Sequence, residues 1–147
     1  MTKMKKLSGA FALALGVTVT PAPAVAGELL VIAHASNTAS TLDKGAIKAH
    51  FLKQKGEWGD GNKVRPADQD SDLKGNFVSK VLGMTSTDYE RYWLERKYAA
   101  AEAPPKKVDD DEAMLKYVGA SKGAIGYIDA DSLGDNKKVK VLLRITY

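Results

Sequence analysis

The sequence predicts an α/β fold in which a mixed, mostly parallel sheet is flanked by helices. Short apolar runs of strand length occur near both ends of residues 27–147, and segments with helical periodicity separate them. Strands that alternate with helices are typical of layered α/β domains with a largely parallel sheet. A chain of this length can bury one sizeable core, so we expect a single domain over residues 27–147.

Residues 1–26 have the pattern of a cleaved export signal. They begin with three lysines, and the apolar stretch at residues 7–19 is too short to cross a bilayer comfortably. Ala24 and Ala26 occupy the small-residue positions of a cleavage site. We therefore expect cleavage after Ala26 and a periplasmic mature protein; an uncleaved anchor is the alternative.

The composition excludes several kinds of site. The chain has 22 basic and 18 acidic residues, and three of the basic ones lie in the predicted signal, which leaves 19 against 18. A nearly neutral domain gives no reason to expect a nucleic-acid partner. With no cysteine and only two histidines, disulfides, thiolate sites and histidine-rich metal sites are excluded, and we expect no cofactor and no metal.

The first predicted strand is residues 29–34, "LLVIAH", a continuous apolar run of the kind that is buried on both faces of a sheet. A helix over 41–52 follows behind a Thr41 cap. The glycine-rich region 53–62 predicts turns, and 63–68 reads as a short second strand.

The middle of the chain is predicted to be helical. Apolar residues share one side of a helix that starts at Ser71 and stops at Gly83. A further helix is expected to begin within "TSTDYE" (85–90), where Thr87 and Glu90 have the spacing of a capping box.

The last third begins with "APPKK" at 103–107, which predicts a break. A helix over 109–119 starts with four acidic residues, which helix N-termini favour. Strands at 124–128 and 138–145 complete the order. Glycine weakens a strand interior, so Gly126 indicates a bulge or a close backbone approach.

The three aspartates Asp68, Asp70 and Asp72 alternate along the chain as at the start of a calcium loop. The EF-hand pattern requires Gly and Glu further on, and those places hold Leu73 and Ser79. The preferred interpretation is a turn capped by Ser71 or by Asp70, with calcium binding as the alternative.

Two strand-to-helix loops offer groups that bind anions. The loop 35–41, "ASNTAST", is small and polar, so its backbone N–H groups and hydroxyls can point at an anion. Ser71 offers a second such group. Because ligands of open α/β sheets bind at these loops, both are expected to face one oxyanion; the alternative is that both only cap helices. No catalytic triad or paired-carboxylate motif is present, so we expect a protein that is not an enzyme.

Several segments occur in an order that resembles a known family. They are "VIAHASNTASTLDKGAIKAHFL", "EWGDGNKVRPAD", "NFVSKVLG", "YERYW" and "GAIGYI". Over residues 29–145 the chain is similar to the small phosphate-binding-protein-like domains. These are relatives of the periplasmic substrate-binding protein of phosphate ABC transporters, in the type II periplasmic binding protein superfamily. The resemblance implies one lobe, the second, of a two-lobed binding protein.

The resemblance also implies a ligand site. Family members carry Ser-Gly-Thr at a helix start and a phenylalanine six residues after the serine. Ser71 and Phe77 keep that spacing, while Asp72 and Leu73 stand in place of Gly and Thr. Ala67 stands where the family has an arginine.

The expected ligand is inorganic phosphate or another small oxyanion, and the expected partner is a membrane transporter or sensor protein. The candidate ligand residues are Ser36, Asn37, Ser40, Thr41 and Ser71, with Arg65 as the charge partner. The alternative is a degenerate lobe that acts as a periplasmic interaction or sensor module without a small ligand.

Overall fold

The computed structural model describes Gly16 and residues 27–147. Apart from Gly16, the predicted signal peptide lies outside this part of the chain, so cleavage after Ala26 stays a prediction. In chain order the elements are β1 (Glu28–His34), α1 (Lys44–Phe51), β2 (Arg65–Gln69), α2 (Leu73–Asn76), the π-helix η1 (Phe77–Val81), α3 (Ser86–Ala100), β3 (Lys106–Val108), α4 (Asp111–Ala120), β4 (Ala124–Asp129), the 3₁₀ helix η2 (Ala130–Ser132) and β5 (Val139–Thr146).

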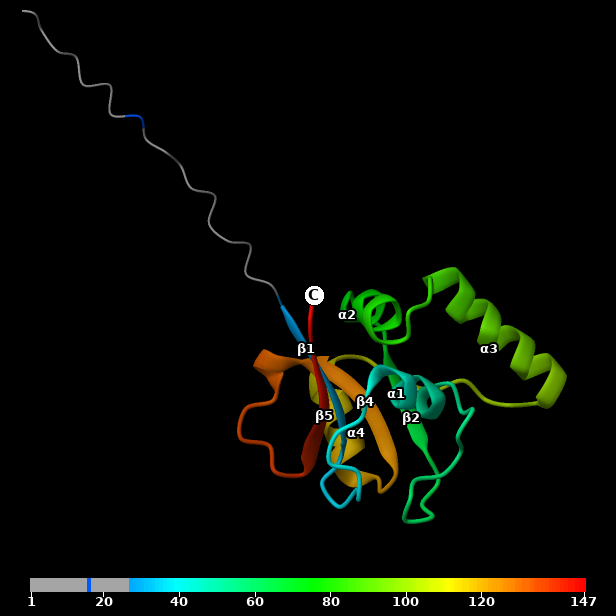
Figure 1. The fold of residues 1–147 in the computed structure, drawn as a ribbon, viewed down its shortest axis with the longest axis horizontal. Helices are drawn as coiled ribbons and strands as arrows, with labels where there is room; N and C mark the ends of the chain where they lie inside the picture. The colour runs from blue at the N-terminus through cyan, green and yellow to red at the C-terminus, as the bar shows by residue number, and fades with distance from the viewer. Residues whose placement is uncertain (1–15, 17–26) are drawn as a thin grey trace, which may run out of the picture.

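The strands form one mixed sheet in the order β3-β2-β4-β1-β5 (Figure 1). Strand β2 is parallel to β3 and β4, whereas β1 is antiparallel to β4 and β5. Arg65 pairs with Ala124, and Ala33 pairs with Ile125, so the end of β1 lies at the edge where β2 and β4 begin. The predicted α/β class with a mixed sheet is confirmed. The expectation that the sheet is mostly parallel was wrong, because two of its four strand pairs are antiparallel.

Helices cover both faces of the sheet, and β1 contributes to both cores. Residues 29–33 are all fully buried, as the continuous apolar run predicted. Alternate residues of β1 point to opposite faces, where one core contains Ile47 of α1 and Phe77 of η1, and the other contains Met114 and Val118 of α4.

Gly126 lies where β4 packs against α4. A Cβ at this position would lie 2.3 Å from Sδ of Met114, which confirms the predicted close approach. Gly123, just before β4, has φ +83°, and a Cβ there would lie 2.1 Å from the carbonyl oxygen of Lys63. The two glycines of "GAIGYI" therefore serve packing and backbone geometry.

Two predicted helix caps were wrong. Helix α1 is capped by Asp43, whose side chain accepts the N–H of Ala46 at 2.7 Å, and not by Thr41. The N–H of Leu42 is bonded to the carbonyl of Leu142 on β5 at 3.1 Å, which ties the residue just before the Asp43 cap to the sheet.

Helix α3 is capped by Thr85, which accepts the N–H of Asp88 at 3.1 Å, and not by Thr87. The N–H of Met84 bonds to the carbonyl of Val78 at 3.1 Å and ends the preceding turn there. In both helices a tertiary or preceding contact selects one cap from several polar neighbours.

The helix predicted from Ser71 to Gly83 divides into α2 and η1. Its N-cap is Asp72, without a side-chain cap bond, so the predicted cap by Ser71 or Asp70 was also wrong. Gly83 follows with φ +63°, in agreement with its predicted role as the stop. Strand β3 was missed because Pro104 and Pro105 predict a break; the strand begins directly after them at the sheet edge. Among the described residues, no helix is long and apolar enough to cross a membrane.

Candidate functional site: an acidic cleft at the ends of β2 and β4

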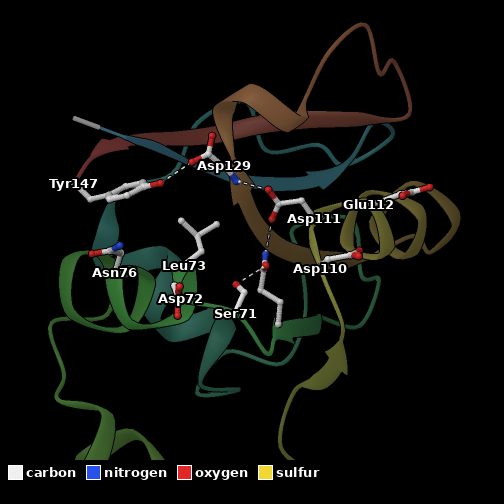
Figure 2. A pocket seen from close by; sticks show the side chains of 10 residues that line it. Ser71, Asp72, Leu73, Asn76, Asp110, Asp111, Glu112, Asp129 and Tyr147 are labelled. Carbon is white, nitrogen blue, oxygen red and sulfur yellow. Dashed lines mark hydrogen bonds between the residues drawn. The ribbon is translucent and has the colours of Figure 1, made fainter. Parts of the chain in front are cut away.

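A cavity of about 540 Å³ lies at the edge where β2 and β4 end, the edge at which open α/β sheets bind ligands. The starts of α2 and α4, the end of β4 and Tyr147 surround it (Figure 2). We call it the acidic cleft; it is lined by Gln69, Ser71, Asp72, Leu73, Asn76, Asp110, Asp111, Glu112, Asp129 and Tyr147.

The charge of this cleft is negative. Half of the lining residues are carboxylates, and none of these described residues carries a positive charge. One carboxylate, that of Asp110, caps α4 by accepting the N–H of Ala113 at 2.9 Å. A phosphate dianion would meet the remaining carboxylates at a cost of about 1–4 kcal/mol per close charge.

The carboxylate of Asp111 accepts three hydrogen bonds at the cleft. Its Oδ1 accepts from Nε2 of Gln69 at 2.9 Å, and its Oδ2 accepts from the N–H of Asp129 at 3.1 Å and from the hydroxyl of Ser132 at 2.7 Å (Figure 2 draws the first two). Backbone N–H groups, hydroxyls and amides are the donors that an oxyanion would use. Asp111 is therefore an internal anion at this site.

The hydroxyl of Ser71 is also engaged within the chain. It donates to Oε1 of Gln69 at 2.7 Å, while Nε2 of Gln69 donates a second bond to the carbonyl of Tyr127 at 2.8 Å. Gln69 is only 2% exposed, so its amide is held in one orientation between Ser71, Asp111 and β4.

Tyr147 forms another wall of the cleft. Its hydroxyl donates to Oδ2 of Asp129 at 2.5 Å (Figure 2), and this hydrogen bond, with a smaller contribution from burial, raises the pKa of Tyr147 to about 12. The ring lies against Gly27, where a Cβ would be 2.3 Å from Cζ of the tyrosine. The hydrogen bond thus ties Tyr147 to the end of β4.

The structure does not bring the predicted ligand residues together. Strand β1 runs opposite to β2. The loop 35–41, which follows β1, therefore lies at the edge where β2 begins, whereas Ser71, which follows β2, lies at the opposite edge. Arg65 is exposed at the start of β2, also away from Ser71. The expectation that the two loops face one point assumed that their strands run the same way, and it is wrong.

Within the loop that follows β1, the polar groups contact one another. The hydroxyl of Ser36 lies 2.8 Å from Nδ1 of His34, and Ser40 and Thr41 are exposed. Asn37 is 6% exposed; its Oδ1 accepts the N–H of Ala39 at 2.9 Å.

The backbone carbonyl of Asn37 accepts from Nζ of Lys140 at 2.6 Å. Nδ2 of Asn37 has no partner among the described residues. This loop therefore keeps one buried donor and one nearby cation, and Ser71 lies at the opposite edge of the sheet.

The residues that define the cleft were mostly missed. Asp111 was interpreted only as one of four acids at a helix start, and Gln69 was not singled out. Asp129 follows the glycine-containing strand "AIGYI", and its place at the end of that strand was the one signal available. Within residues 27–147, no group of three or more His, Cys, Asp or Glu side chains is placed to hold a metal ion, so the calcium alternative receives no support.

Comparisons with known proteins show the fold. No family model matches the sequence, and no curated protein matches it. An ABC-type phosphate transport receptor from Vibrio cholerae is similar in structure, with a TM-score of 0.61 and 16% identity over 80% of this chain and 46% of that chain. PstS from Borrelia burgdorferi has a TM-score of 0.61 and 12% identity over 80% of this chain and 47% of that chain.

A third similar structure is a phosphate ABC transporter substrate-binding protein from Clostridium perfringens with bound phosphate. Its TM-score is 0.60 and its identity 15%, over 80% of this chain and 44% of that chain. The protein spans less than half of each solved chain, as expected for one lobe of such a binding protein.

Proposed function

We propose that the protein is a single, non-enzymatic binding-protein lobe that works in the periplasm as an interaction module and holds no phosphate in its acidic cleft. The observation that carries this proposal is the position of Asp111. Its carboxylate already accepts from Gln69, from the N–H of Asp129 and from Ser132. An oxyanion at this site would have to displace the carboxylate of Asp111, which is part of the chain itself, from these three donors.

The extent of the structural match fits the same proposal. The fold matches less than half of the solved binding proteins, and the described residues supply one wall of a ligand site of that kind. A membrane transporter or a sensor protein is the kind of partner that we propose. Fold likeness alone does not carry the phosphate activity of those proteins to this chain.

A second candidate function is oxyanion binding through the loop 35–41. One observation favours it: Nδ2 of Asn37 is buried without an acceptor among the described residues, close to the ammonium of Lys140. The carboxylate of Asp43 argues against oxyanion binding here. It already caps α1, the helix after this loop, and so places a negative charge at the helix start where an anion would bind. This candidate keeps Ser36, Asn37, Ser40 and Thr41 as ligand residues and Arg65, at the same edge of the sheet, as the charge partner; it sets Ser71 aside.

The test is thermal unfolding of the purified protein across a phosphate series, with sulfate, nitrate and chloride at matched ionic strength. A ligand at about 100 times its dissociation constant adds roughly 2.7 kcal/mol to the free energy of unfolding. That gain would raise the midpoint by about 10 °C in a domain of this size.

We expect no saturable, phosphate-selective rise. A selective rise that survives Asp111→Asn but disappears in Asn37→Ala would favour the second candidate. A selective rise that is insensitive to Asn37→Ala and lost in Ser71→Ala would place phosphate in the acidic cleft and overturn the main proposal.

A further inference from the structure

The outer surface of α3 carries two large apolar side chains. Leu94 and Tyr98, 55% and 79% exposed, are the exposed large hydrophobic side chains of the described residues. They lie four residues apart and so share one side of the helix. Helix α3 extends to one side of the molecule, away from β5 (Figure 1). Neighbouring exposed apolar side chains of this kind mark interaction surfaces.

A cavity of about 320 Å³ adjoins this surface. One wall is the face of α3 that carries Glu90, Trp93, Leu94 and Lys97. The spacing of these residues is that of one helical face. The opposite wall is the segment 104–107, with Pro104, Pro105 and Lys107. We call this cavity, together with Tyr98, the α3 groove.

The segment that forms the opposite wall is held in place. Nζ of Lys53 donates to the carbonyl of Ala103 at 2.8 Å, and Nε of Arg96 donates to Oε2 of Glu102 at 2.6 Å. The chain reverses at Ala101, which has φ +50°. A clamped wall next to two rigid prolines makes the groove preformed, so binding costs little ordering.

The charged and polar groups at the base of the groove are already paired with one another. Asp68 is 3% exposed and accepts from the hydroxyls of Tyr89, at 3.0 Å, and of Tyr127. The carboxylate of Asp68 also lies 3.3 Å from Nζ of Lys74. Burial, followed by the charge of Asp68, raises the pKa of Tyr89 well above its usual value, so this tyrosine stays a donor. The base therefore attracts no further charge.

The rim of the groove carries charges without local partners. Among the described residues, no ion pair is formed by Lys97, by Lys107 or by Glu90. Two cations against one anion favour a negatively charged occupant. Inorganic phosphate alone would leave the apolar walls of Leu94 and Pro104 uncovered, so the occupant needs an apolar body as well.

We propose that the α3 groove binds an acidic peptide segment of a partner protein, which inserts one large apolar or aromatic side chain between α3 and Pro104–Pro105. The acidic residues that flank this side chain lie against Lys97 and Lys107. This inference rests on the proposed function, because it names the surface through which the interaction module acts. An anchor side chain in a pocket with a charged rim is the usual arrangement of an interface hot spot.

The experiment is a titration of the ¹⁵N-labelled protein, followed by NMR, with three synthetic peptides. The probe has one phenylalanine flanked by glutamates; one control replaces the phenylalanine by alanine, and another replaces the glutamates by lysines. The chain has two tryptophans, so the indole N–H signals report separately. Trp93 lines the groove, whereas the indole of Trp58 donates to the carbonyl of Gly123 at 2.8 Å, on another part of the protein.

We expect saturable shifts of Trp93 and of the α3 amides with the probe only, and an unchanged Trp58 signal. Leu94→Ala should weaken the probe about tenfold, and the double variant Lys97→Met with Lys107→Met should do the same. Lys116→Met, an exposed lysine on α4, is the matched control and should leave binding unchanged.

Equal binding of the lysine-flanked peptide, or no saturable shift with any peptide, would overturn this inference. A dimer in sedimentation that Leu94→Ala dissociates would also overturn it, because a second copy would then be the occupant. Each of these outcomes leaves the proposed function unaffected as long as phosphate does not stabilise the protein selectively. A selective phosphate effect would instead remove the proposed function itself.

Discussion

The carboxylate of Asp111 accepts a hydrogen bond from the backbone N–H of Asp129, 3.1 Å away, and so joins the first turn of α4 to the end of β4. The two residues are separated by a helix and a strand, yet they meet at one edge because β4 runs back along α4. The contact places a fixed negative charge among donors that would otherwise face a ligand. The chemistry of the acidic cleft follows from this arrangement.

Asp111→Ala should destabilise the protein by about 1–3 kcal/mol, because donors of Gln69, Asp129 and Ser132 lose their acceptor. Phosphate or sulfate should restore part of this loss in the variant and none in the wild type. Urea unfolding with and without each anion measures both effects. Glu112→Ala is the control, since it removes a charge from the same cleft; equal rescue of both variants would refute the specific role of Asp111.

Gly123→Ala should destabilise the protein by more than the roughly 1–3 kcal/mol that a left-handed non-glycine residue costs. The added Cβ would lie 2.1 Å from the carbonyl oxygen of Lys63, on top of the strain at φ +83°. Gly61 has the same φ, and a Cβ there has nothing within 4 Å. Urea unfolding of the two alanine variants separates the effect of the Lys63 contact from that of backbone strain. Equal losses in the free energy of unfolding would show that the contact is unimportant.

Stability should fall as the pH drops below 6.5, with His50 as a main cause. Burial lowers the pKa of His50 from its usual 6.5, so the folded state favours the neutral ring, which stacks on Trp58 at 4.3 Å. The unfolded chain takes up the proton first, so this contribution is complete above pH 6.5 and is lost progressively below it. Urea unfolding at about pH 8 and about pH 5 measures the slope. His50→Gln should flatten the slope; an unchanged slope in this variant would contradict the assignment.

Asp68→Ala should be among the most damaging single changes, at about 3–5 kcal/mol. It leaves the ammonium of Lys74 and the hydroxyls of Tyr89 and Tyr127 without their shared acceptor. Asp70→Ala, an exposed neighbour, should change stability by no more than about 0.5 kcal/mol. Thermal and urea unfolding compare the two variants, and a small effect at Asp68 would show that the network is dispensable.

Export should remove residues 1–26 and leave Gly27 as the first residue. Intact-mass measurement and N-terminal sequencing of the protein from a periplasmic fraction check this expectation. Recovery of the uncut chain from membranes would instead support the alternative of an uncleaved anchor.

Local sequence patterns predicted most elements of the fold. The apolar run of β1, the stop at Gly83 and the close packing at Gly126 were all readable, because burial periodicity and glycine geometry depend on neighbouring residues. The helix caps were less accurate. Thr41 and Asp43 are both good caps. The structure uses Asp43, and the residue between them, Leu42, is hydrogen-bonded to Leu142 on β5.

The candidate site was much less predictable. Ser71 was expected to face the loop 35–41, and it lies at the opposite edge of the sheet. Asp111 looked like an ordinary acid at a helix start, and only its contacts with Gln69 and Asp129 show that it satisfies the cleft from within. Strand direction and side-chain partners are long-range properties that no local spacing encodes.

Composition and periodicity along the chain are enough to predict the α/β class, the order of most elements and the absence of thiol chemistry. They do not predict that β1 runs against β2, that Asp111 accepts three hydrogen bonds at the acidic cleft, or that Leu94 lies beside a clamped groove. Pairing direction and contacts between distant residues are set by the packing of whole elements, because the free energy of that packing is shared over the entire core.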